Sequence, residues 1–114
     1  MNCDVLILPE AKNDLLDIYE YVSTHDSFNN ADSLLDELEN RCARLNTTPE
    51  RGHSVPELKR VSVTGFREIH FKPYRIIYQI IKKTVFIHAV LDGRRDLQEL
   101  LEKRMIRLDD EFLK

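Results

Sequence analysis

The spacing of apolar residues changes once along this chain, near Val61. Before this point they recur every three to four residues, as on one face of a helix, and after it they alternate or run continuously, as in strands. The change predicts a helical first half joined to a β-rich segment, which is an α+β arrangement. Because 114 residues is the usual size of one domain, we expect a single domain over residues 1–114.

The first half predicts a strand and two helices. Residues 3–8 alternate in the manner of a short strand. Apolar residues then follow helical spacing over 11–22 and again over 31–45, and two helices joined by a short turn form an αα-hairpin. Either Asp26 or Ser27 is placed to cap the second helix.

The second half predicts three strands and a last helix. Only Lys72-Pro73 and then Lys82-Lys83 separate successive strands, which is the length of tight hairpins. Asp96 is placed to cap a helix whose apolar stripe runs over 97–108. The sheet is expected to be mostly antiparallel. The strands are expected at about 66–71, 74–81 and 84–91, and residues 49–60, with two prolines and a glycine, are expected to be a loop.

Tight hairpins fix the register of the three strands, and the register sorts their side chains by face. One face is nearly all apolar, so we expect the αα-hairpin to cover it; the other is mixed and is expected to meet a macromolecule. The apolar face receives Ile69, Phe71, Tyr74, Ile76, Tyr78, Ile80, Val85, Ile87, Ala89 and Leu91. The mixed face receives Glu68, His70, Arg75, Ile77, Gln79, Ile81, Phe86, His88, Val90 and Asp92.

The mixed face gathers groups suited to phosphodiester chemistry. The register places His70 opposite Arg75, and Ile77 between Glu68 and His88. A guanidinium binds phosphate oxygens in pairs, and a carboxylate or imidazole moves protons. The same residues could equally form a structural ion-pair network. The residues alone favour the network, because a one-residue slip of register would disperse a catalytic cluster.

Charge is divided unevenly along the sequence. Residues 1–58 carry 4 basic and 12 acidic side chains, whereas residues 59–107 carry 12 basic and 5 acidic ones. A local basic field attracts a polyanion or an acidic protein segment even when the whole chain has a net charge of −3. Arg94 and Arg95 precede the last helix, whose N-terminal N–H groups would add to such a field. A tight turn with solvated charges is the alternative.

Several classes of protein lose support from the sequence. It has no glycine-rich phosphate loop, no G-x-S-x-G and no H-E-x-x-H. Its histidines and cysteines lack metal-ligand spacing, so we expect neither a metal nor a cofactor, and Cys3 and Cys42 to be reduced thiols. No apolar run approaches the roughly 20 residues of a membrane span, and the N-terminus lacks an export signal, which predicts a cytoplasmic protein.

Five segments together resemble the RelE/ParE superfamily of bacterial type II toxins, over nearly the whole chain. The resemblance is closer to the ParE-like branch. It implies a small toxin that an acidic antitoxin wraps and silences in a hetero-oligomer. The segments are Asp17-Ile18-Tyr19 within residues 11–21, Pro49-Glu50-Arg51-Gly52-His53, Gly65-Phe66-Arg67-Glu68-Ile69, Tyr74-Arg75-Ile76-Ile77-Tyr78 and Gly93-Arg94-Arg95-Asp96.

The resemblance implies two alternative activities. The RelE-like branch cleaves messenger RNA on the ribosome, and the matching positions would be Arg75, Arg95 and Glu57, with His88 as a further candidate. The ParE-like branch binds DNA gyrase and traps it on broken DNA without catalysis. Because the last tyrosine is Tyr78, the C-terminal tyrosine of several nucleases is missing. We therefore expect gyrase inhibition, with messenger RNA cleavage, or a toxin fold that only binds its partner, as alternatives.

Two surfaces follow as expectations for the toxin. The antitoxin is expected to lie over the sheet and beside the last helix, because it must cover both basic and apolar side chains. The target-binding residues are expected to be Arg67, Arg75, Arg94 and Arg95. The antitoxin-binding residues are expected to be Ile77, Ile81, Phe86 and Val90.

Overall fold

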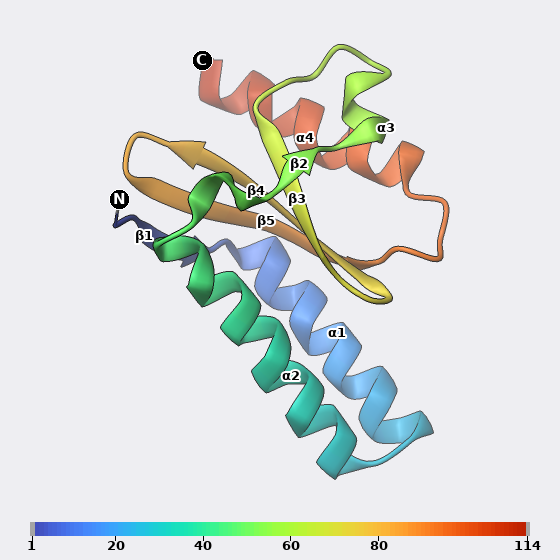
Figure 1. The fold of residues 1–114 in the computed structure, drawn as a ribbon. Helices are drawn as coiled ribbons and strands as arrows, with labels where there is room; N and C mark the ends of the chain where they lie inside the picture. The colour runs from blue at the N-terminus through green and yellow to red at the C-terminus, as the bar shows by residue number, and fades with distance from the viewer. Residues whose placement is uncertain (1, 114) are drawn as a thin grey trace.

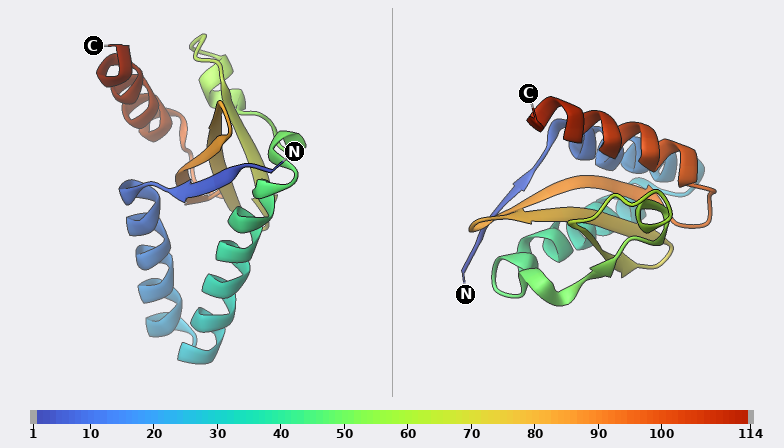
Figure 2. Two further views of the ribbon diagram at one scale, coloured as in Figure 1. Left: turned by 90° about the vertical axis from the view of Figure 1, so that its left-hand side faces the viewer. Right: turned by 90° about the horizontal axis from the view of Figure 1, so that it is seen from above.

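A computed structural model describes residues 2–113, and the side chains of residues 2–106. An open five-stranded sheet of order β1-β5-β4-β3-β2 has a helical hairpin on one face and α3 and α4 on the other (Figures 1 and 2). The elements are β1 (Asp4–Ile7), α1 (Pro9–His25), α2 (Phe28–Ala43), η1 (Arg44–Asn46), η2 (Pro49–Arg51), β2 (His53–Ser54), α3 (Pro56–Lys59), β3 (Phe66–Phe71), β4 (Tyr74–Ile81), β5 (Thr84–Asp92) and α4 (Gln98–Leu113).

The predicted α+β arrangement is confirmed. β1 pairs parallel with β5, and every other pair of neighbouring strands is antiparallel. Ser27 caps α2 by accepting a hydrogen bond from the Asn30 N–H at 3.0 Å, and the Asp96 carboxylate accepts one from the Gln98 N–H, where α4 begins. The expectation of a plain loop over 49–60 is wrong, because η2, β2 and α3 lie in it.

One residue of β5 changes the register that counting predicts. Between β4 and β5, the pairs from the Lys82-Lys83 turn up to Tyr78 and Ile87 are as expected. The next pair joins Ile77 to Ala89, so His88 has no partner residue in β4. Such a β-bulge places one extra residue in one strand, so every later residue of that strand changes face. The faces predicted for Ala89, Val90, Leu91 and Asp92 are therefore wrong.

The sheet separates two apolar cores. Under α1 and α2, the first contains Leu15, Leu38, Tyr78, Ile87 and, because of the bulge, Val90. The second lies between the opposite face of the sheet and the helices α3 and α4. It contains Leu58, Ile77, Ala89, Leu91, Leu97, Leu101 and Met105, with Leu100 at its edge, which confirms the stripe predicted for α4 except for Leu108, whose side chain lies outside the described residues.

The second core corrects the expectation of an accessible mixed face. Ile77 is 0% exposed and Val90 1% exposed, so neither presents a surface to an antitoxin. Helices α3 and α4 cover Ile77, and the helical hairpin covers Val90. None of the helices within residues 2–113 is long and apolar enough to cross a membrane.

Candidate functional site

A charged network centred on Arg75 links β4 to α3 and β3. The Arg75 Nη1 and Nη2 groups donate to the two Glu57 carboxylate oxygens at 2.6 and 2.7 Å. Its Nε and Nη2 groups donate to the Glu68 carboxylate at 2.7 and 2.8 Å. The His70 Nε2 atom lies 2.6 Å from the same carboxylate. The predicted proximity of Glu68, His70 and Arg75 is confirmed, and α3 adds Glu57.

The network is largely shielded from solvent. The side chains of Arg75 and Glu57 are 12% and 14% exposed, and that of Glu68 is 1% exposed. The Arg75 guanidinium holds the pKa of Glu57 below its ordinary value, and the two carboxylates raise the pKa of Arg75. Because the contacts use four of the five guanidinium N–H groups, this cation has little capacity left for an external anion.

The turn after β5 packs closely against this network because residue 93 is glycine. A Cβ atom at Gly93 would lie 2.9 Å from both the Arg75 Cδ atom and the Pro73 carbonyl oxygen. Any larger residue would push the turn and the guanidinium stem apart. The sequence identified Glu57 only by resemblance, since a four-residue helix such as α3 has too few residues to show a period.

His88 is not part of this network, contrary to its predicted position opposite Ile77. It sits at the bulge, 2% exposed, with its Nε2 atom 3.2 Å from the Gln79 amide oxygen and its ring edge against Phe66. Burial lowers the pKa of His88 to about 4, so the ring is neutral at pH 7. A buried neutral imidazole in contact with apolar groups is a packing residue rather than a proton shuttle.

Backbone groups freed by the bulge are bound by two charged side chains that the sequence did not single out. The Asp14 carboxylate of α1 accepts a hydrogen bond from the Val90 N–H at 3.0 Å. The Arg104 guanidinium of α4 donates to the His88 carbonyl oxygen at 2.7 Å and to Asp14. Arg104 also pairs with Glu10 at 2.7 Å. This bridge joins α1, β5 and α4 across the edge of the sheet.

The four arginines predicted to bind the target do not form one surface. Arg75 is enclosed, whereas Arg67 points to the hairpin side and donates to the carbonyl oxygen of Gly52 at 2.9 Å. Arg94 pairs with Asp92 at 2.7 Å, and this pairing lowers the pKa of Asp92. Arg94 and Arg95 are exposed in the turn before α4. Of the four, these two alone are accessible at the predicted helix end.

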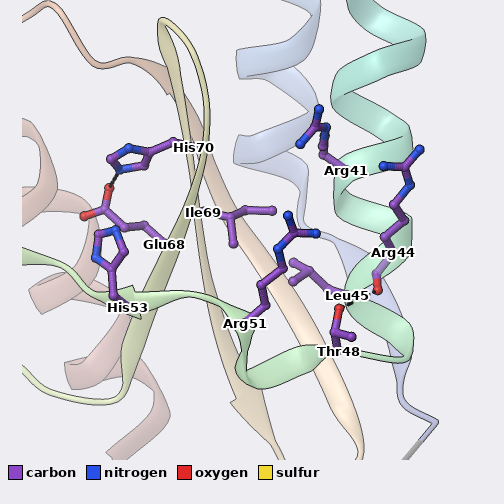
Figure 3. A pocket seen from close by; sticks show the side chains of 9 residues that line it. All are labelled: Arg41, Arg44, Leu45, Thr48, Arg51, His53, Glu68, Ile69 and His70. Atoms are coloured by element: carbon purple, nitrogen blue, oxygen red, sulfur yellow. Dashed lines mark hydrogen bonds and ion pairs between the residues drawn. The ribbon is translucent and has the colours of Figure 1, made fainter.

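A pocket of about 260 Å³ lies along β3, at the C-terminal end of α2. Three arginines line it, one each from α2, η1 and η2 (Figure 3). They were missed because short elements hide their spacing, although three of the four basic residues within 1–58 fall in 41–51. The described residues contain no group of three or more potential metal ligands. The lining residues are Arg41, Arg44, Leu45, Thr48, Arg51, His53, Glu68, Ile69 and His70.

Known proteins share this fold. A chain of the "Chromosomal ParDE TA system from P. aeruginosa" has a TM-score of 0.65 and 17% identity, over 77% of this chain and 92% of that one. A chain of the toxin-antitoxin complex RelBE2 from Mycobacterium tuberculosis has a TM-score of 0.59 and 20% identity, over 79% of this chain and 96% of that one. A mutant of E. coli toxin RelE, with two arginines changed to alanine and in the free state, has a TM-score of 0.61 and 15% sequence identity. The match covers 94% of this chain and 98% of that one.

Sequence comparison is more specific than the shared fold. No curated protein is similar to this chain in sequence. The profile of the family described as "ParE toxin of type II toxin-antitoxin system, parDE" matches residues 5–97. This match runs from β1 through the network to the start of α4, and so covers most of the chain. The chain therefore belongs to the ParE toxin family of type II toxin-antitoxin systems, within the RelE/ParE superfamily.

Proposed function

We propose that this toxin acts by binding DNA gyrase and trapping it on broken DNA. One observation carries the proposal: the guanidinium of Arg75, one of the two arginines that match those of RelE-like nucleases, is held between Glu57 and Glu68. A phosphodiester would have to displace two carboxylates that are already bound at 2.6 to 2.8 Å. A toxin that works by contact with a protein does not need this charge to be free.

Other parts of a ribonuclease site are also poorly placed. His88 is buried and neutral and lies away from Arg75, and no tyrosine follows Tyr78 in the sequence. Arg95 is exposed, and its side chain makes no hydrogen bond or ion pair with a described residue. Messenger RNA cleavage on the ribosome remains the second candidate, favoured by the adjacency of Glu57, Glu68 and His70 to Arg75.

We place the antitoxin on the end of the sheet that α4 leaves open. Leu6 of β1 lies opposite Phe86 of β5, and Phe86 opposite Gln79. Leu6 is 53% and Ile81 39% exposed, and the exposed Lys82 follows Ile81. An acidic amphipathic segment complements such a surface, in the cytoplasm where gyrase and ribosomes are found. Of the four residues expected to bind the antitoxin, we therefore retain Ile81 and Phe86, because Ile77 and Val90 are buried.

The proposal is tested with purified toxin, gyrase, ATP and relaxed plasmid. We expect linear plasmid to accumulate once bound protein is digested, because a trapped enzyme leaves its cut DNA unsealed. Arg95→Ala is the informative variant, since Arg95 is exposed and its loss leaves the Arg75 network intact. Lys59→Ala, an equal charge change on α3, is the matched control.

A parallel reaction tests the second candidate. Purified ribosomes carrying a defined messenger RNA are incubated with the same toxin, and the RNA ends are mapped by primer extension. Transcripts cut within codons, together with plasmid that gyrase still supercoils normally, would replace the gyrase proposal by the nuclease one. Intact transcripts and linear plasmid are the result that we expect.

A further inference from the structure

Two of the three arginines of the pocket beside α2 are anchored, Arg41 through its guanidinium and Arg51 through its backbone. The Arg41 guanidinium stacks on the Phe71 ring, 4.9 Å from its centroid. Arg51 lies in η2, whose ends are tied to the buried Tyr78 hydroxyl. This hydroxyl donates to the Pro49 carbonyl oxygen at 2.7 Å and accepts from the Gly52 N–H at 2.9 Å. A site that is ordered before binding loses less entropy when a ligand arrives.

These arginines also retain donors that the chain does not use. Among the described residues, the side chains of Arg44 and Arg51 have no hydrogen-bond or ion-pair partner, and both are exposed. The Arg41 Nε atom is buried and lies 3.9 Å from the Glu37 carboxylate, beyond hydrogen-bond distance. Arg75 differs, because four of its five N–H groups already donate to carboxylates of the chain.

The carboxylate that lines the pocket does not cancel this charge. Figure 3 shows the three guanidinium groups on one side of β3, on the side to which Ile69 points, with Glu68 and both histidines on the other. Glu68 is already bound by Arg75 and His70. The pocket therefore presents two unpaired cations, Arg44 and Arg51, together with the loosely paired Arg41, beside the apolar side chain of Ile69.

We infer that this pocket binds a phosphate group of single-stranded nucleic acid. A phosphate can accept from several guanidinium groups at once, whereas a carboxylate offers only two oxygens. A volume of about 260 Å³ lies just below the usual range for ligand pockets of roughly 300–1,000 Å³, so it fits one small group and not a helix. This site is separate from the Arg75 network.

The surrounding charge favours a flexible strand over a long duplex. The helical hairpin beyond the pocket carries most of the 12 acidic side chains of residues 1–58, and these repel an extended polyanion. A single strand can place one or two phosphates in the pocket and turn away from the hairpin. The partly exposed side chain of Ile69 then contacts the sugar or base next to the bound phosphate.

Fluorescence anisotropy of purified toxin with a labelled oligothymidylate of about 12 nucleotides tests the inference. We expect the double variant Arg44→Ala with Arg51→Ala to weaken binding at least tenfold. Each phosphate contact to a single strand adds about 0.7 to the slope of log affinity against log salt, so the variant should lose about 1.4. Thermal unfolding should be unchanged, because both side chains are exposed.

Lys59→Ala with Lys83→Ala is the matched control, since it removes the same charge elsewhere on exposed positions. If the control loses as much affinity and slope as the arginine pair, the binding is non-specific and the inference fails. It also fails if the oligonucleotide does not bind at low salt, or if thymidine monophosphate or a polyglutamate peptide binds the pocket more tightly. Neither gyrase nor ribosomes are present, so this result does not depend on the proposed target.

Discussion

The positive charge of Arg75 is satisfied within the chain itself. Glu57 on α3 and Glu68 on β3 hold it from two elements, so the network fastens α3 to the sheet. Removing one member of such a shielded set leaves the remaining charges without full compensation. Arg75 matches an arginine of RelE-like nucleases, but in this toxin its position is better explained by stability.

Glu57→Gln tests that explanation. The amide keeps the shape of the side chain but loses the charge that pairs with Arg75, so we expect unfolding to cost about 2 kcal/mol less. Urea denaturation at pH 7 measures the change. Glu50→Gln, at an exposed position of η2, is the control and should stay within about 0.5 kcal/mol of the unchanged chain.

The pairing of Glu57 also has a predicted pH dependence. Because Arg75 lowers the pKa of Glu57 in the folded chain, the unfolded chain binds more protons as the pH falls below about 5. The contribution of Glu57 to stability is therefore present at neutral pH and is lost in acid. Glu57→Gln should flatten the acid limb of a plot of unfolding free energy against pH; an unchanged limb would contradict the assignment.

His88 should dominate the same plot at higher pH. Its pKa is about 4 when folded, against about 6.5 in an unfolded chain. The unfolded state binds the extra proton between these values, so stability falls as the pH drops from 7 to 5, by about 2 kcal/mol. In His88→Gln, which keeps a polar group near Gln79, we expect this loss to be absent, whereas the exposed His25 replaced in the same way should leave it in place.

At the scale of elements, the two hairpins were predictable and the bulge was not. Two-residue turns leave a single pairing, which is why the bounds of β3 and β4 and the meeting of His70 with Arg75 agree with the counted register. After His88, the residues Ala89, Val90 and Leu91 of β5 are all apolar, so no alternation in the sequence marks the extra residue. The calculated faces, and with them the position of His88, fail for this reason.

The bulge is held by side chains from distant elements, which predicts a strong effect of Asp14. Asp14→Ala leaves the Val90 N–H without its acceptor and the Arg104 guanidinium without one of its partners. We expect a loss of about 2–3 kcal/mol in the unfolding free energy. Asp17→Ala, one helical turn further on an exposed position of α1, should change it by less than about 0.5 kcal/mol.

Across the whole molecule, charge is distributed by element. The acidic helical hairpin extends away from the sheet (Figure 1), and the unpaired arginines lie where the hairpin meets η2 and β3. The uneven charge was visible in the sequence, but the fold was needed to show which cations are neutralised internally. Arg75 and Arg104 are enclosed by carboxylates, whereas Arg44 and Arg51 are not.

The two cores on opposite faces of one sheet predict that neither face is stable alone. A chain ending at residue 96 lacks Leu97, Leu101 and Met105, which cover Ile77 and Ala89. Each of these apolar side chains contributes about 1.5–3 kcal/mol when buried, a sum comparable to the whole stability of a small domain. We expect this chain to lose cooperative urea unfolding and to bind a hydrophobic dye. A chain ending at residue 106 keeps all three side chains and should unfold cooperatively; the same behaviour in the shorter chain would show that the hairpin core suffices.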